Sequence, residues 1–162
     1  MVNPPGRSWD EIAQRELRFE EIPSTTSKIS ITVYTASKLH HAPLWRRLAI
    51  TWPEIHFTAR WPNDHVSDTG HPLWPEDSPA HGQVFWEHDV QDIENSDVVL
   101  CYAEGSDVLR GALVEVGIAL ALSRHVIVVG ESDSYGTWQY HKNVLRVKDL
   151  PAARNLLHLL AC

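Results

Sequence analysis

Short apolar segments alternate with amphipathic ones along the chain. In KISITVYTAS the apolar residues alternate with polar ones, which predicts a strand with one buried face. The runs DVVLCYA and HVIVVG are apolar at almost every position, which is typical of strands buried on both faces. The patterns predict strands at 28–35, 54–61, 97–103, 125–130 and 144–150. The last of these is only partly apolar.

The segments between these strands have helical spacing. Leu44, Leu48 and Trp52 recur at intervals of four after Pro43, and proline suits a first helical turn. Further helices are expected at 84–96, 108–123 and 151–161. The intervening stretch 62–82 is rich in proline and glycine, which predicts a long loop of the kind that is often functional.

Strands that alternate with helices predict an α/β domain with a mostly parallel sheet of about five strands and helices on both faces. We expect one such domain over 29–162, preceded by an N-terminal extension, 1–28, in which 9–20 could form a short helix. Ligands of such sheets bind beyond the carboxyl ends of the strands. This rule directs attention to the segments after Tyr34 and Tyr102.

Composition narrows the possible functions. The chain has 162 residues and a net charge of -7, and its lysines and arginines never cluster beyond a pair, which argues against nucleic acid as a partner. No apolar run reaches the roughly 20 residues of a membrane span, and the first residues lack the order of a signal peptide. Two cysteines suit a cytoplasmic protein without a disulfide framework.

The ten histidines form no recognisable metal-binding pattern. Neither His-Glu-x-x-His nor Cys-x-x-Cys occurs in the sequence. We therefore expect no metal and no cofactor, with the histidines on the surface and in loops.

Glu115 is out of place in its segment. It lies within DVLRGALVEVGIALALSRHVIVVG, and its neighbours one helical turn away are Gly111, Ala112, Ile118 and Ala119. These small and apolar residues would let a ligand approach, but they would also suit helix packing. From the pattern alone, a functional carboxylate and a solvent-facing one remain equally open.

The segments YTAS, DIENSDVVLCY and RGALVEVGIALALSRHVIVVG resemble the nucleoside 2-deoxyribosyltransferase family. The resemblance covers about residues 29–147. It implies a flavodoxin/Rossmann-like doubly wound sheet and an enzyme that acts on the N-glycosidic bond of 2′-deoxynucleosides.

By this resemblance Glu115 is the nucleophile that attacks C1′ and forms a covalent deoxyribosyl ester. Asp89 lies eight residues before Asp97, which opens the third strand, and the resemblance gives it the proton transfer to the base. Asp92, one helical turn further on, is the competing candidate. A carboxylate beside C1′ can stabilise or capture the oxocarbenium ion, while a second carboxyl group protonates the leaving base.

Further residues are expected around the sugar. Tyr34 and Ser37 resemble the loop after the first strand that frames it, and Gly111 would allow close packing against it. Asp107 resembles an acidic residue that precedes the nucleophile, although its spacing to Glu115 is longer than in the family. Arg110 is either solvated or a contact for a 5′-phosphate.

Other residues are expected at the base or at a subunit contact. Trp61 and Trp74 flank the long loop and are candidates for stacking on the base. Trp138, His141 and Asn143 resemble a family segment that reaches the site of a neighbouring subunit, so we expect a homo-oligomer, a dimer or larger.

The resemblance implies a transferase whose partners are a nucleoside or nucleotide and a free base. Two alternatives stay open. One is an N-glycosidase that hydrolyses 2′-deoxynucleoside 5′-monophosphates, and the other is a nucleotide-sensing module without turnover, because one fold can host many functions. A purely structural protein would leave both carboxylates unexplained.

Overall fold

The computed structural model describes residues 30–75, 78–132 and 135–161. The N-terminal extension and the short helix expected at 9–20 lie outside these residues. The strands are β1 (Ile31–Ala36), β2 (Ile55–Phe57), β3 (Val98–Tyr102), β4 (His125–Val129) and β5 (Val144–Val147). The helices are η1 (Leu39–His41), α2 (Ala42–Thr51), α3 (Trp61–Asp64), α4 (Pro79–Glu94), α5 (Gly111–Ala121), η2 (Thr137–Tyr140) and α6 (Leu150–Ala161).

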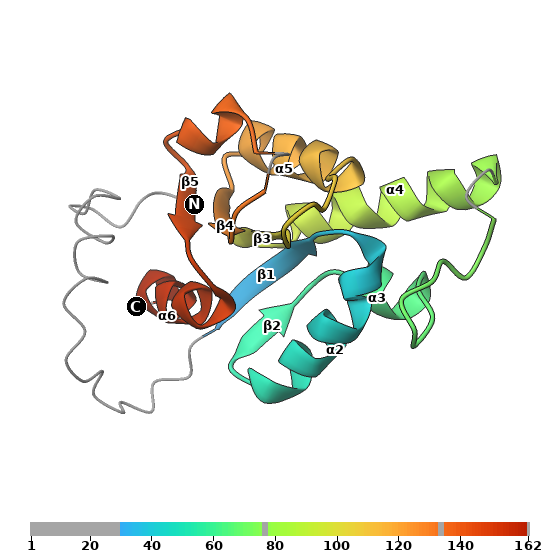
Figure 1. Ribbon diagram of the computed structural model, residues 1–162, viewed down its shortest axis with the longest axis horizontal. Helices are drawn as coiled ribbons and strands as arrows, with labels where there is room; N and C mark the ends of the chain where they lie inside the picture. Colours follow the sequence, from blue (N-terminus) through green and yellow to red (C-terminus); the bar gives the residue numbers. More distant parts are fainter. Residues whose placement is uncertain (1–29, 76–77, 133–134, 162) are drawn as a thin grey trace.

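The strands form one sheet in the order β2-β1-β3-β4-β5, and every pair is parallel. The α/β class and the doubly wound sheet expected from the sequence are confirmed. The chain reverses its direction of winding between β1 and β3, which lie side by side in the middle of the sheet (Figure 1). In sheets of this order the crevice at that switch point is where ligands bind.

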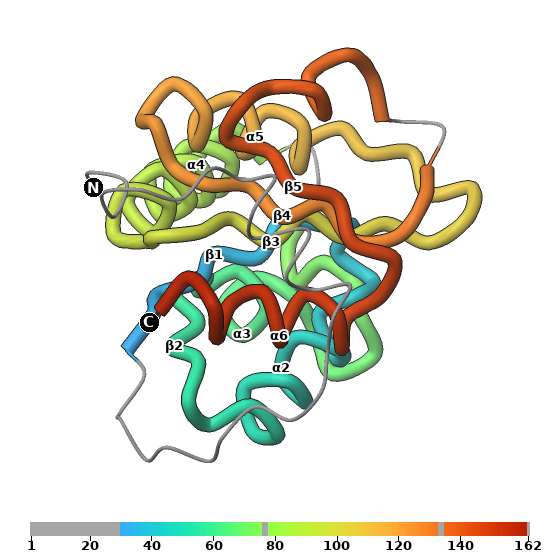
Figure 2. Tube along the Cα trace, turned by 90° about the vertical axis from the view of Figure 1, so that its left-hand side faces the viewer, coloured from blue at the N-terminus to red at the C-terminus, as the bar shows by residue number. Residues whose placement is uncertain are grey.

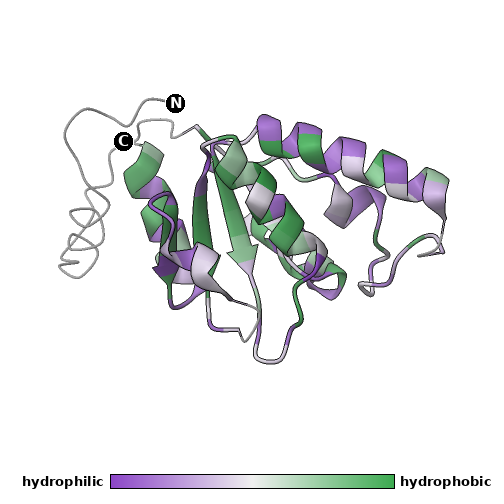
Figure 3. Cartoon of the chain, turned by 90° about the horizontal axis from the view of Figure 1, so that it is seen from above, coloured by the Kyte–Doolittle hydropathy of each residue, from purple (hydrophilic) through white to green (hydrophobic). Residues whose placement is uncertain are grey.

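Helices cover both faces of the sheet. α2 and α6 lie on one face, and α4 and α5 lie on the other (Figures 1 and 2). The central strands are coloured hydrophobic in Figure 3, and β3 and β4 are buried along almost their whole length. This is the expected result of packing between two helical layers. Within the described part of the chain, no helix is long and apolar enough to cross a membrane.

The region between β2 and β3 departs from the sequence-based prediction. The strand expected over 54–61 is limited to β2, and α3 begins at Trp61, with Pro62 in its first turn. α4 begins at Pro79, inside the stretch expected to be a loop over 62–82. In both cases proline opens a helix, where its missing N–H costs nothing.

Two carboxylates on the amino-terminal side of the sheet serve the architecture. The Asp97 side chain accepts hydrogen bonds from the backbone N–H of Thr32 at 3.0 Å and from its hydroxyl at 2.8 Å, which ties β3 to β1. Glu54, before β2, accepts a hydrogen bond from Arg154 of α6 at 2.7 Å. Both carboxylates therefore have hydrogen-bond partners that hold elements of the fold together.

Candidate active site

Three buried polar side chains meet near the switch point. Tyr34 comes from β1, Asp89 from α4 and Glu115 from α5, and their exposed fractions are 0 %, 1 % and 5 %. They are close enough for each to shift the pKa of another. The sequence named all three, and the structure brings them together from segments far apart in the chain.

The orientation of α5 decides between the two interpretations of Glu115. Ala112, Val116 and Ala119 are buried with Glu115, whereas Val114 is half exposed. The carboxyl group therefore faces the sheet, and the solvent-facing interpretation is wrong. Helix α5 packs on β1, β3 and β4, which explains why a carboxylate at this position lies over the switch point.

The three side chains leave polar atoms without partners. Among the described residues, Tyr34 Oη, both carboxyl oxygens of Asp89 and Glu115 Oε2 are buried with no hydrogen-bond partner. A buried, unsatisfied polar group typically costs about 1–3 kcal/mol, so a concentration of them in one place requires an explanation. A polar ligand that supplies the missing hydrogen bonds would provide one.

Burial shifts the pKa of every member of this cluster. It raises the pKa of Asp89 to about 7, with nearby Asp92 adding to the increase and Tyr34 and Arg60 opposing it. Burial also raises the pKa of Glu115, and the proximity of Asp89 raises it further. Because the two carboxyl groups disfavour each other's charge, the pair retains a proton at neutral pH.

Tyr34 contributes a hydroxyl group to the same environment. Burial, together with the nearby charges of Glu115 and Asp89, holds its pKa well above the ordinary value for tyrosine. The hydroxyl is therefore a neutral donor at physiological pH. It lowers the pKa of both carboxyl groups, because it can donate to their charged forms.

Asp92 is buried on the same helix but has a different role. Its carboxylate accepts hydrogen bonds from the backbone N–H of Arg60 at 2.9 Å and from Arg60 Nε at 2.8 Å. Its backbone carbonyl accepts a hydrogen bond from Thr58 Oγ1. These contacts tie α4 to the segment between β2 and α3. The carboxylate of Asp92 therefore has hydrogen-bond partners, whereas that of Asp89 has none among the described residues.

Two of the expected site residues have structural contacts. Trp61 is 2 % exposed and its indole N–H donates to the carbonyl oxygen of Thr35 at 2.8 Å, which places it in the core and not in a stacking position. Ser37 accepts a hydrogen bond from the indole N–H of Trp45 at 2.8 Å and donates to the carbonyl of Lys38. Ser37 remains at the carboxyl end of β1, as expected.

The residues just before α5 and at its start differ in their surroundings. Asp107 contacts His41, with 2.7 Å between its Oδ2 and the imidazole Nε2. Arg110 and Gly111 are exposed at the start of α5, and a Cβ at Gly111 would meet no atom within 4 Å. The surface at the start of α5 is therefore not covered by other described residues.

The candidates for a subunit contact lie around η2. Trp138 is partly buried and its indole Nε1 has no partner within the described ranges. His141 is exposed, and its Nδ1 accepts a hydrogen bond from the backbone N–H of Asn143 at 3.1 Å. Their role toward a neighbouring subunit stays a prediction.

A group of aromatic side chains that the sequence pattern did not predict lies around Phe85, one helical turn before Asp89 on α4. His65 is 7 % exposed, and its ring lies 5.0 Å from that of Phe85 and 5.7 Å from that of His88. His65 Nε2 and His88 Nδ1 are buried without partners in the part of the chain described. The expectation that the histidines lie on the surface is wrong for His65. The sequence clue to this group was Phe85, which lies one helical turn before Asp89 and therefore on the same face of the helix.

Trp74 completes this group. Its ring is edge-on to that of His65 at 4.5 Å and stacks on His81 at 5.6 Å. Trp74, unlike Trp61, therefore remains a candidate for stacking on a base. Burial lowers the pKa of His65, so its imidazole is neutral and can both donate and accept a hydrogen bond.

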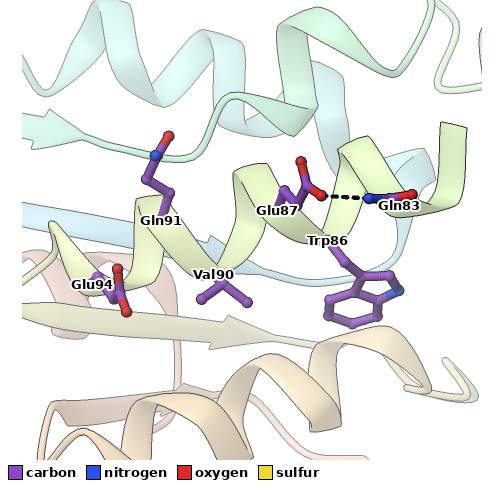
Figure 4. Close-up of a pocket in the computed structure, with 6 residues that line it drawn as sticks. All are labelled: Gln83, Trp86, Glu87, Val90, Gln91 and Glu94. Carbon is purple, nitrogen blue, oxygen red and sulfur yellow. Dashed lines mark hydrogen bonds between the residues drawn. The ribbon is translucent and has the colours of Figure 1, made fainter. Parts of the chain in front are cut away.

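A shallow groove of about 570 Å³ lies along the outer side of α4 (Figure 4). Trp86 and Val90 project from one side of the helix there, while Gln83 donates a hydrogen bond to Glu87. None of the groove residues belongs to the buried cluster. The groove is thus separate from the candidate active site.

A doubly wound sheet is the fold that the sequence resemblance implied, and the observed strand order is β2-β1-β3-β4-β5. Comparison with solved structures confirms the fold. The 2-deoxyribosyltransferase of Bacillus psychrosaccharolyticus is similar with a TM-score of 0.52 and 13 % identity, over 76 % of this chain and 90 % of that one.

A second similar structure is the CMP N-glycosidase BcmB of Clostridium botulinum, with a TM-score of 0.48 and 14 % identity, over 79 % of this chain and 97 % of that one. No family model matches the sequence, and neither does any curated protein. The chain therefore shares the fold of a deoxyribosyltransferase, and its activity has to be argued from its own residues.

Proposed function

We propose that this protein cleaves the N-glycosidic bond of 2′-deoxynucleosides and passes the sugar to another base through a covalent deoxyribosyl-Glu115 ester. The observation that carries the proposal is the set of buried, unpartnered oxygens of Tyr34, Asp89 and Glu115 at the switch point. Stability alone does not favour such a cluster, whereas a two-carboxylate reaction requires it.

In the first step Glu115 attacks C1′ while the bond from C1′ to the base nitrogen breaks. Asp89 gives its proton to the departing base, for which a pKa of about 7 is suitable. The positive charge that develops on the sugar favours the ionised form of Glu115, and Tyr34 can donate to that carboxylate. The step leaves a sugar ester, a free base and an ionised Asp89.

In the second step a nitrogen of the incoming base attacks C1′ and displaces the Glu115 carboxylate. Asp89 takes up the proton that the incoming base loses, which restores both carboxyl groups. The absence of a 2′-hydroxyl in the substrate eases ionisation at C1′, because an electron-withdrawing substituent is missing. The cycle needs no metal or cofactor.

We propose that the base binds beside Asp89. Phe85 and Trp74 offer aromatic surfaces, and the unpartnered imidazole nitrogens of His65 and His88 can form hydrogen bonds with a heterocycle. A bound base would supply the hydrogen bonds that these groups lack.

A hydrolase acting on 2′-deoxynucleoside 5′-monophosphates is the second candidate. Lys38 and Arg110 are exposed at the carboxyl edge of the sheet, where a phosphate group could meet them. Water would then replace the second base in the second step. A sensing module that binds a nucleotide without turnover is the third outcome that the experiment below distinguishes.

Three apolar side chains of the α4 and α5 layer are exposed. They are Val84 of α4 and Val114 and Leu122 at α5, which are 45 %, 51 % and 40 % exposed. We propose that a second copy covers this face in a homo-oligomer. Light scattering during gel filtration tests this: Val114→Glu should dissociate the oligomer, and a wild-type protein that elutes as a monomer would contradict it.

A chromatographic assay tests the activity. Deoxynucleosides and their 5′-monophosphates are incubated with and without a second free base, beside Glu115→Gln as a control. New nucleoside that forms only with the second base supports transfer, whereas free base with deoxyribose 5-phosphate supports hydrolysis. Binding without turnover of any substrate would move the assignment to the sensing module.

A further inference from the structure

Two adjacent histidines converge with an aspartate at the carboxyl edge of β1 and β3. His40 and His41 belong to η1, directly after β1, and Asp107 lies 66 residues beyond His41, between β3 and α5. Asp107 Oδ2 is 2.7 Å from His41 Nε2, and Asp107 Oδ1 is 3.6 Å from His40 Nε2. One possible ligand atom from each residue lies within 4.8 Å of the other two.

We propose that His40, His41 and Asp107 bind a divalent transition-metal ion, for which zinc is the best fit. Two imidazoles and a carboxylate form a ligand set that such ions prefer. Ligands bound to zinc at about 2.0–2.1 Å lie roughly 3.3 Å apart in a tetrahedron. The two observed separations bracket this value, and the three candidate ligand atoms all lie within 4.8 Å of one another, so His40 has to move closer to complete the set.

The surroundings hold two of the three ligands in place. His41 is 6 % exposed, and its ring is edge-on to that of Tyr102 at 4.9 Å. Asp107 Oδ2 accepts a hydrogen bond from the backbone N–H of Glu104, and Ser132 Oγ donates to the Asp107 carbonyl. Such outer contacts fix the orientation of metal ligands and raise affinity.

The third ligand, His40, is free of the constraints of the core. The His40 side chain is 54 % exposed, so it can adjust to an ion, and the remaining coordination positions would be open to water or an anion.

The sequence did not predict this site because no local spacing encodes it. His40 and His41 are consecutive, and their carboxylate partner comes from another loop. The sheet brings the two loops together at the switch point. The expectation that the chain binds no metal rested on short motifs alone.

Zinc titration of the full-length protein, freed of metal with a chelator, tests the proposal. We expect one equivalent of Zn²⁺ to be retained after gel filtration, and Co²⁺ to give visible d–d absorption bands. Asp107→Asn and His41→Ala should weaken zinc binding at least ~100-fold, beyond the 10–100-fold loss typical of outer contacts. His40→Ala should weaken it about 10-fold.

Exposed residues elsewhere provide matched controls. His71→Ala and Asp64→Asn should bind zinc as the wild type does, and circular dichroism identifies any variant that fails to fold. His40→Ala keeps the test valid if the buried His41 variant unfolds, because His40 is largely exposed. Wild-type protein that retains no zinc, or equal affinity in wild type, His40→Ala and Asp107→Asn, would overturn the proposal.

Discussion

Asp89 and Asp92 lie one turn apart on α4, and both are buried, at 1 % and 5 % exposed. Asp92 is held by the backbone and guanidinium groups of Arg60, whereas both oxygens of Asp89 have no partner among the described residues. The same residue type thus has two different roles on one helix. A paired carboxylate fastens two segments together, and an unpaired one is available for a proton or a ligand.

The same distinction separates Glu54 from Glu115. Glu54 is paired with Arg154 and His158, and these contacts lower its pKa against the opposing effect of burial. Among the described residues, the groups that shift the pKa of Glu115 include no cation, and burial raises that pKa. Where burial is not offset by a partner, the carboxyl group is costly for folding and suited to chemistry.

Glu115→Gln should have the largest effect. The substitution keeps the size of the side chain and removes the nucleophile, so we expect base release to fall at least ~10³-fold. The fold should be retained, because a buried charge is lost and no ion pair is broken. Assays at saturating substrate, with circular dichroism as a control, measure this; a variant with more than a tenth of the wild-type rate would contradict the assignment.

Asp89→Asn should have the next largest effect. Loss of the general acid should slow release of an unactivated base by about 10²–10⁴-fold. A substrate whose base leaves without protonation should be affected much less, so the ratio of the two rates isolates proton transfer. Equal slowing of both substrates would show that Asp89 acts in some other way.

Asp92→Asn should affect folding and spare catalysis. Loss of charge from the pair with Arg60 should lower the free energy of unfolding by roughly 1–3 kcal/mol, a range that allows for the partial exposure of Arg60. The rate of base release per folded molecule should stay within about threefold of wild type. Urea denaturation measures the free energy of unfolding, and the same assay measures the rate. A loss of rate as large as that of Asp89→Asn would contradict the structural role of Asp92.

The pH dependence of stability should also distinguish the two aspartates. Because the pKa of Asp89 is raised to about 7 in the folded protein, folding favours its protonated form. Its contribution to stability is full below about pH 4 and is lost as the pH rises to about 7. The free energy of unfolding of Asp89→Asn should therefore rise relative to that of wild type by ~1–3 kcal/mol as the pH increases across this window. If the free energies of unfolding of the two proteins change in parallel with pH, the shifted pKa of Asp89 is contradicted.

His65→Asn should give the smallest effect. If its imidazole contacts the base, kcat/KM should change unequally among the four deoxynucleosides, by about fivefold for the most affected one. His71→Ala, in an exposed position, is the matched control. A uniform change for all bases would indicate a structural role for His65.

Much of the fold could be predicted from the sequence. The buried strands β3 and β4 are continuous apolar runs, and the parallel arrangement of the strands directs attention to the segments beyond their carboxyl ends. The limits of β2 and α4 could not be predicted as well. Proline favours a loop in a sequence pattern, yet Pro62 and Pro79 both lie in the first turn of a helix.

The candidate site was predictable only where a motif carried it. Glu115 and Asp89 follow from the family resemblance, but spacing alone could not choose between Asp89 and Asp92, because both lie on the buried face of one helix. The decision depends on Arg60, whose partner is distant in sequence. The burial of His41 and His65 is equally unpredictable from the sequence, because it depends on tertiary contacts.

Covalent trapping at Glu115 tests the central claim most directly. The protein would be mixed with a deoxynucleoside, quenched with acid within one turnover and digested, and its peptides examined by mass spectrometry. We expect a deoxyribosyl adduct on the peptide that contains Glu115, and none in Glu115→Gln. Turnover without an adduct, or an adduct on a different carboxylate, would contradict the proposal that the unpaired Glu115 is the nucleophile.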